Sequence, residues 1–216
     1  MLTPKIPIAQ EGYPFIAAAA LLTLVAALLG WPWTATLLIL VTLFVVYFFR
    51  DPERVIPAHD DKTILCPADG RVIGVEQFDE CPFISGKVIR ISVFMNVFNV
   101  HVNRAACAGS VKKVVYKPGM FFAADNKKAA LENESCATVL HLASGQEVAM
   151  VQIAGLIARR IVCWLQPGDE VAAGQRFGLI RFGSRVDVYV PADSQVTAFP
   201  GRGKVKAGQT VLAVLA

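Results

Sequence analysis

The hydrophobic residues of the amino-terminal quarter form two long runs separated by a short break. The runs cover residues 15–29 and 33–49, and neither they nor the break contain a charged side chain. Each run is slightly shorter than the roughly 20 residues with which a helix crosses the hydrocarbon core of a bilayer. The pattern predicts a membrane-associated helical hairpin over residues 13–49, preceded by a polar segment, 1–12.

The break reads Gly30-Trp31-Pro32-Trp33. A proline in the middle of one long helix would remove a backbone hydrogen bond and clash with the preceding turn, so two helices are favoured. Tryptophan side chains prefer the lipid–water interface. We therefore expect the hairpin to turn at 30–33. Because both runs are short, it either spans the bilayer or re-enters it shallowly.

Basic residues flank the expected hairpin, whereas its turn has none. Lys5 precedes it, and Arg50 and Arg54 follow it. The positive-inside rule then places both ends of the hairpin, and the chain after it, on the cytoplasmic side. A cleaved signal peptide is disfavoured, because it would have a single apolar core followed by a small-residue cleavage site.

From residue 50 onward, short apolar stretches lie between turns that contain glycine and proline, a pattern typical of β-strands. The predicted strands are 63–65, 71–75, 88–93, 110–116, 137–142, 148–153 and 185–190. The only helix expected in this part covers 126–132. Residues 50–216 are therefore predicted to form one mostly β domain.

A short repeat indicates the architecture of that domain. Val171-Ala172-Ala173-Gly174-Gln175 recurs as Val205-Lys206-Ala207-Gly208-Gln209, and an apolar strand follows each copy. Such units resemble those of the barrel-sandwich, hammerhead-like folds of biotinyl and lipoyl domains. A swinging-arm carrier would need a lysine, flanked by methionine or aspartate, at a hairpin tip between the copies. No such lysine occurs, so the repeat indicates architecture only.

Composition agrees with a membrane-tethered β domain. The 216 residues are 55% hydrophobic, with a mean hydropathy of +0.50. The net charge of +4 is compatible with an anionic membrane surface. The basic residues are scattered and form no stripe with aromatic residues, so we expect no nucleic-acid partner. Five cysteines without a Cys-x-x-Cys pair predict reduced, mostly buried thiols, with neither a disulfide framework nor a bound metal.

A Gly-Ser step stands directly before the predicted strand 185–190. Gly183 has no Cβ and leaves room for a nucleophile to approach its carbonyl. Ser184 supplies a hydroxyl, which becomes reactive only through a base or a strained geometry. A bare Gly-Ser pair is also an ordinary turn. These residues alone therefore leave open a turn, a serine hydrolase and a self-cleaving site.

The segment 177–191 resembles the processing site of phosphatidylserine decarboxylase proenzymes, especially their short bacterial form. Four further segments resemble the family in the same order, namely 67–70, 92–104, 117–119 and 155–169. Together they extend the resemblance over most of residues 50–216.

This resemblance implies self-cleavage between Gly183 and Ser184 into a β chain, 1–183, and an α chain, 184–216, that stay associated. It implies that Ser184 becomes a covalent pyruvoyl cofactor. The mature lyase would convert phosphatidylserine to phosphatidylethanolamine and CO2 through a Schiff base. Its partners would be membrane lipids, and the enzyme would be located on the cytoplasmic side of a bacterial inner membrane. The sequence is also compatible with a homo-oligomer.

The resemblance also implies roles for individual residues. His101 matches the family's histidine motif and is the expected general base, and Asp69 matches its acidic partner. Longer members carry a second histidine where this chain has Arg104, and a small hydroxylated residue where it has Arg185. Arginine stays protonated and cannot act as a base. Arg104 and Arg185 are therefore candidate substrate-binding residues, and the hypothesis for Arg104 is that it binds the lipid phosphate or the serine carboxylate.

Two other classes of function stay open. A membrane-tethered serine hydrolase would use Ser184 without chain cleavage, although no Gly-x-Ser-x-Gly motif supports it. A non-catalytic anchored β module would use the Gly-Ser step only as a turn. A chain that stays intact would favour these two classes.

Overall fold

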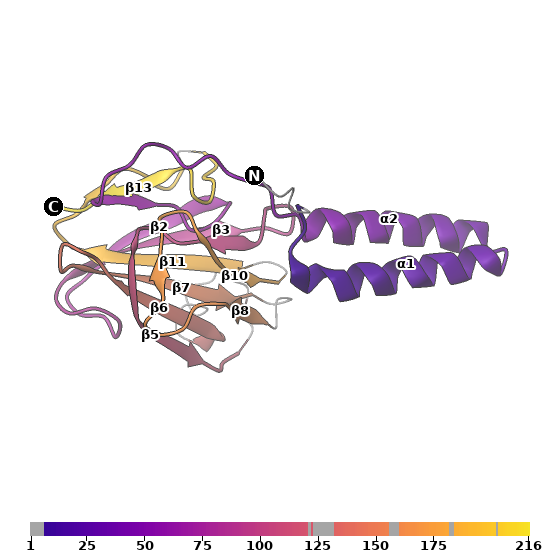
Figure 1. Ribbon diagram of the computed structural model, residues 1–216, viewed down its shortest axis with the longest axis horizontal. Coiled ribbons are helices and arrows are strands. Elements are labelled where there is room, and N and C mark those ends of the chain that lie inside the picture. The colour runs from indigo at the N-terminus through magenta and orange to yellow at the C-terminus, as the bar shows by residue number, and fades with distance from the viewer. Residues whose placement is uncertain (1–6, 121, 123–131, 156–159, 182–183, 202) are drawn as a thin grey trace. The chain divides into compact units, whose positions relative to one another are not determined.

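The computed structural model describes residues 7–120, 122, 132–155, 160–181, 184–201 and 203–216 (Figure 1). The chain divides into two compact units, Met1–Glu53 and Arg54–Ala216.

The first unit is a pair of apolar helices. A short 3-10 helix, Gln10–Gly12, leads into α1, Tyr13–Leu28, and α2 covers Pro32–Phe48. Proline suits the start of α2 because its fixed φ matches a first helical turn, in which its missing N–H has no partner to lose. Gly30 makes the connection with a φ of 69°, a conformation that glycine adopts readily. The two expected helices and their turn are thus present.

The helices lie side by side (Figure 1), and the hydroxyl oxygens of Thr23 and Thr42 are 3.1 Å apart between them. Much of their apolar surface is exposed, as at Leu28, which is 78% accessible. The helical stretch Gln10–Leu28, 19 residues long, is long and apolar enough to cross a membrane, whereas α2 is shorter. An exposed apolar surface of this kind suits contact with lipid.

The second unit is built from antiparallel strands in three sheets. A seven-stranded sheet has the order β2-β3-β11-β7-β6-β5-β9, and two three-stranded sheets have the orders β1-β13-β12 and β4-β10-β8. The strands are β1 Thr63–Leu65, β2 Arg71–Phe78, β3 Val88–Met95, β4 Val102–Arg104, β5 Gly109–Lys117, β6 Ser135–His141, β7 Glu147–Ala154, β8 Ile161–Cys163, β9 Glu170–Val171, β10 Arg176–Ile180, β11 Ser184–Pro191, β12 Gln195–Val196 and β13 Val211–Val214. The mostly β fold is confirmed.

Each of the predicted strands corresponds to an observed one, with ends that differ by a few residues. Sequence patterns did not reveal β4, β8, β9 and β12, which have only two or three residues each. Among strands this short only β1 was predicted, and the others are defined mainly by the strand they pair with. The predicted helix at 126–132 lies almost entirely outside the described residues.

The sequence repeat corresponds to two similar turn-and-strand units. Gly174 donates its backbone N–H to Ala105, and Gly208 donates to Cys66, both at 2.8 Å. The strand after each turn, β10 or β13, pairs with β4 or β1, respectively. Both glycines have positive φ, 74° and 69°. A Cβ on Gly208 would lie only 3.6 Å from Cα of Gly174, so the two turns touch.

The two faces of strand β11 carry different kinds of side chain. Its valines, Val186, Val188 and Val190, are fully buried and belong to the main hydrophobic core. Because side chains alternate along a strand, Ser184 shares this face. The intervening Arg185, Asp187 and Tyr189 project to the other face, where Tyr189 belongs to a smaller apolar cluster.

Candidate active site

Ser184 is the first residue of β11 and is completely buried. It is paired on one side with Met95, the last residue of β3, and on the other with Ala154, the last residue of β7. The serine therefore lies at one end of the central strands, on the face that points into the main core. Gly183, the other half of the expected cleavage site, lies outside the described residues.

The Ser184 hydroxyl donates to the thioether sulfur of Met95, with an Oγ–Sδ distance of 3.4 Å. A thioether is a weak acceptor, so this bond holds the hydroxyl less firmly than an oxygen acceptor would. The same sulfur is approached by Nδ2 of Asn103, at 3.8 Å. The side chain of Asn103 accepts a hydrogen bond from Nε2 of Gln152 at 2.9 Å.

Asn103 and Gln152 are both completely buried, and neither is among the site residues predicted from the sequence. Asn103 lies inside the histidine segment, between His101 and Arg104. Gln152 offered a signal of its own, because it is the only polar residue between Val148 and Ala154 and occupies an inward position of that strand.

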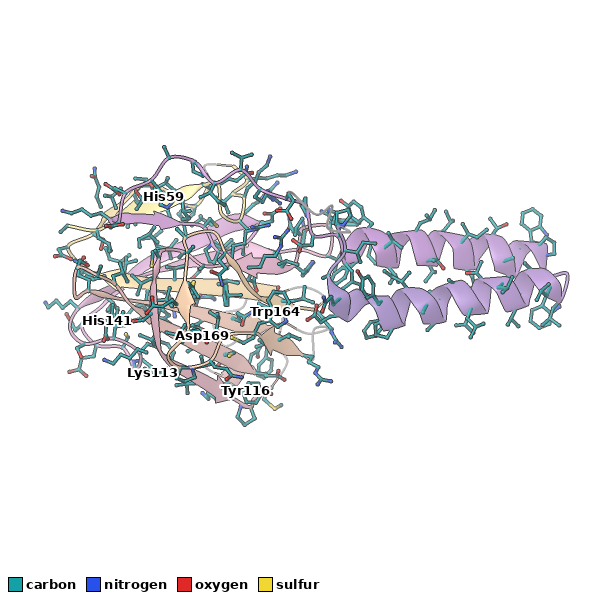
Figure 2. The ribbon with its side chains drawn as sticks, viewed as in Figure 1. His59, Lys113, Tyr116, His141, Trp164 and Asp169 are labelled. Carbon is teal, nitrogen blue, oxygen red and sulfur yellow. The ribbon has the colours of Figure 1, made fainter. Side chains whose placement is uncertain are left out.

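Of the three histidines, His101 is the only buried one; His59 and His141 are exposed and lie apart at the surface (Figure 2). Nδ1 of His101 is 3.0 Å from the backbone oxygen of Asn99. A carbonyl can only accept, so Nδ1 carries the proton and Nε2 is the basic nitrogen. The backbone oxygen of His101 accepts from the N–H of Ile180, shortly before Ser184 in the chain.

Asp69 is held by partners other than His101 among the described hydrogen bonds. Arg54 donates from Nη2 to Oδ2 at 2.8 Å, and the backbone N–H of Ala207 donates to Oδ1 at 2.8 Å. The next residue, Gly70, is pressed against β3, since a Cβ there would lie 2.0 Å from the backbone oxygen of Phe94. The bond from Ala207 connects the turn at Asp69 to the second copy of the sequence repeat. A catalytic role for Asp69 stays a prediction.

The two expected substrate-binding arginines are both buried and both make contacts within the protein. Nη1 of Arg104 donates to the backbone oxygen of Gly174 at 3.0 Å. Arg185, on the face of β11 opposite Ser184, pairs with Asp187 and donates to Oγ of Ser92 at 2.7 Å. These contacts favour structural roles for both, and substrate binding by either one stays a prediction.

The cysteines are all reduced, and those at 66, 107 and 136 are buried. Burial raises the pKa of Cys66 and of Cys107 to about 12. Within the described part of the chain, no three side chains of the types that bind metals come together.

These features define a mostly β protein with an apolar helical hairpin at its amino terminus and a buried serine at the head of a central strand. The model of the phosphatidylserine decarboxylase family matches residues 41–213. The chain therefore belongs to the phosphatidylserine decarboxylase family and is a decarboxylase.

Individual relatives agree over nearly the whole chain. The phosphatidylserine decarboxylase proenzyme of Desulfotalea psychrophila is 52% identical over 212 residues, which cover 98% of each chain. That of Ralstonia nicotianae is 52% identical over 211 residues, covering 96% of this chain and 95% of the relative. That of Nitrosomonas europaea is 51% identical over 217 residues, covering 99% of both. All three names describe a proenzyme.

Proposed function

We propose that this chain is a self-processing phosphatidylserine decarboxylase that cleaves itself between Gly183 and Ser184 and forms a pyruvoyl group from Ser184. The observation that carries the proposal is the position of Ser184, buried at the head of β11 in a member of this family. Among the described residues, its hydroxyl donates to a thioether sulfur, a weak acceptor, so little must be broken before it reacts.

Processing begins when Oγ of Ser184 attacks the carbonyl carbon of Gly183. The peptide C–N bond breaks, its nitrogen takes the hydroxyl proton, and an ester joins the two residues. A base then removes the α-proton of Ser184, a Cα=Cβ double bond forms, and the Cβ–Oγ bond breaks. Residue 183 leaves as a carboxylate, and water hydrolyses the remaining dehydroalanine to a ketone and ammonia. His101, with Nε2 as its basic nitrogen, is the proposed base.

The surroundings of Ser184 fit a pyruvoyl group at this position. Strand β11 pairs with β3 and β7 along its length, so the new terminus would stay in place after cleavage. The α chain would also retain β13, which pairs with β1, and the two chains would therefore remain associated. Such a ketone binds the amine of a substrate and accepts the electron pair left behind when CO2 departs.

The proposed substrate is phosphatidylserine and the product is phosphatidylethanolamine. The hairpin supports this substrate class, because a lipid's acyl chains can stay in the bilayer while a tethered domain acts on the headgroup. Basic residues at both ends of the hairpin favour the cytoplasmic side of the membrane as the proposed location of the catalytic unit.

The test is the intact mass of the purified full-length chain in detergent, compared with Ser184→Ala. We expect the wild type to yield one fragment ending at Gly183 and one that begins with a pyruvoyl-blocked residue 184. Ser184→Ala should stay whole at 23.3 kDa. The matched control is Ser194→Ala, which alters another buried serine of the proposed α chain and should be cleaved normally.

A wild-type chain that stays whole during prolonged incubation with phosphatidylserine vesicles would overturn this proposal. The membrane-tethered hydrolase or the anchored β module would then explain the chain better. Release of CO2 from phosphatidylserine by the cleaved protein completes the test.

A further inference from the structure

Gln152 has an unusual position for a glutamine. Its side chain is completely buried in β7, and its Oε1 has no hydrogen-bond partner among the described residues. A buried acceptor without a partner destabilises a fold, whereas an apolar residue of the same shape would carry no such penalty. An amide in this place therefore calls for an explanation other than stability.

The other end of the Gln152 amide is firmly engaged. Nε2 donates to Oδ1 of Asn103 at 2.9 Å. This bond fixes which way the Asn103 amide points, because its oxygen must face Gln152 and its nitrogen must then face the opposite side. On that side lies Met95, whose Sδ is 3.8 Å from Nδ2 of Asn103.

Two donors thus converge on one weak acceptor. Oγ of Ser184 is 3.4 Å from the Met95 sulfur that Nδ2 of Asn103 also approaches. A thioether satisfies an amide N–H poorly, so this N–H remains available for a stronger acceptor that develops nearby. The oxygen of Ser184 becomes such an acceptor when its bond to carbon breaks.

The neighbouring strand leaves room for this pair of amides. Gly178 of β10 is opposite Asn103 of β4 in the register. A Cβ at residue 178 would lie 2.9 Å from Nε2 of Gln152 and 2.4 Å from the backbone oxygen of Val162. The two amides can therefore meet inside the core only because residue 178 lacks a side chain.

We propose that Asn103 is a catalytic residue of self-processing and that Gln152 is the residue that positions it. This inference rests on the proposed function. In the elimination step a base removes the α-proton of Ser184, the electron pair forms the Cα=Cβ bond, and the Cβ–Oγ bond breaks. Oγ leaves as part of the Gly183 carboxylate. The N–H of Asn103 donates to this oxygen as its negative charge develops, which lowers the barrier.

The test compares Gln152→Glu with Gln152→Met in the full-length chain. Each protein is made by cell-free synthesis in the presence of phosphatidylethanolamine–phosphatidylglycerol vesicles, and the rate of cleavage is followed from about pH 6 to about pH 9. Rates are expressed relative to wild type at each pH. His101 and the thiols of Cys136 and Cys163 are present in every variant, and Gln152→Met shows how their contribution appears without a new carboxyl group.

The carboxyl group introduced by Gln152→Glu would, while protonated, donate to Oδ1 of Asn103 as the glutamine does. Once ionised it can only accept, so ionisation turns the Asn103 amide around and directs its oxygen towards Ser184. Burial raises the pKa of a carboxyl group, so we expect this one to be protonated at the low end of the pH range, where the relative rate of Gln152→Glu should be near that of wild type. It should fall at least about tenfold as pH rises, towards the roughly 10²–10³-fold that loss of one such donor costs.

Gln152→Met cannot donate at any pH, so its relative rate should be low and independent of pH. Asn103→Leu should be slower by about 10²-fold or more. The matched control is Thr138→Val, which removes a different fully buried polar group from the adjacent strand β6 and should be cleaved at the wild-type rate.

Several outcomes would overturn the inference. A wild-type chain that is never cleaved overturns it together with the proposed function. A cleaved wild type with an equally fast Asn103→Leu overturns the inference alone. A pH-independent ratio for Gln152→Glu, with rates that merely follow the melting temperatures of the variants, would show that the amide pair only supports the fold.

Discussion

Arg185 and Asp187 form a two-point ion pair on the face of β11 that points away from Ser184. Nε of the arginine is 2.6 Å from Oδ1 of the aspartate, and Nη2 is 2.9 Å from Oδ2. The arginine is only 4% exposed and the aspartate is completely buried. Arg185 therefore has a use inside the fold, because it neutralises a buried carboxylate on the same strand.

The first prediction concerns this ion pair. Asp187→Ala leaves the guanidinium of Arg185 buried without its counter-charge, so we expect the free energy of unfolding to fall by about 3–5 kcal/mol. The double variant Arg185→Met/Asp187→Leu removes both charges and should lose less. Denaturant unfolding of the three proteins checks this order.

The control for the ion pair is Asp79→Ala, which breaks the exposed pair between Asp79 and Lys87, whose charged atoms are 3.2 Å apart. Exposed pairs contribute little, so the loss should stay below about 1 kcal/mol. Equal losses for Asp79→Ala and Asp187→Ala would contradict the assignment of Arg185 to the fold.

The second prediction compares the effect of adding a Cβ at Gly70 with that of adding one at Gly74. A Cβ at Gly70 would lie 2.0 Å from the backbone oxygen of Phe94, whereas one at Gly74 would meet nothing closer than 4.0 Å. Gly70→Ala must push the turn that carries Asp69 away from β3, so we expect destabilisation by about 1–3 kcal/mol or more. Gly74→Ala should be close to neutral. Thermal unfolding of both variants tests this difference, and equal effects would exclude the tight packing at residue 70.

The third prediction concerns the reactivity of thiols. A hydrogen bond from the Cys136 thiol lowers the pKa of Cys163 and raises that of Cys136. Only the thiolate is alkylated readily, so Cys163 should react with iodoacetamide at a lower pH than an ordinary cysteine. Cys66 and Cys107, whose pKa values burial raises to about 12, should stay unmodified near neutral pH.

Peptide mass spectrometry after labelling at a series of pH values measures each cysteine separately. In Cys136→Ala the donor is lost, so the labelling curve of Cys163 should move to higher pH. A curve that does not move would mean that Cys136 does not stabilise the Cys163 thiolate.

Much of the fold could be predicted because local patterns are repeated within each element. The alternation of Val186, Val188 and Val190 located β11, and the repeated turns around Gly174 and Gly208 located the strands that follow them. Strand β4 was missed because it is defined by its pairing with β10, which is far along the chain, and no turn signal of its own marks it.

The residues of the candidate site could likewise be predicted only in part. Ser184 and His101 stand in recognisable local segments, so the sequence was enough to select them. The relation between Gln152, Asn103 and Met95 depends on which faces of three separate strands meet, and no local pattern records that. The bond between Asp69 and Ala207 could not be predicted either, because the two residues are far apart in the sequence.

The last prediction separates two roles for Arg104. Its guanidinium donates to Gly174, and its Cδ would lie 3.0 Å from a Cβ on Gly208, so it joins the two repeated turns. Arg104→Met keeps most of the apolar stem and removes the donor, which should lower stability by about 1–2 kcal/mol. That corresponds to a fall of roughly 2–8 °C in the melting temperature. KM for phosphatidylserine, measured on the processed fraction, should stay unchanged.

If Arg104 instead binds the lipid phosphate or carboxylate, KM should rise by about tenfold or more while the melting temperature stays the same. The two measurements on this one variant therefore decide whether Arg104 supports the fold or binds the substrate.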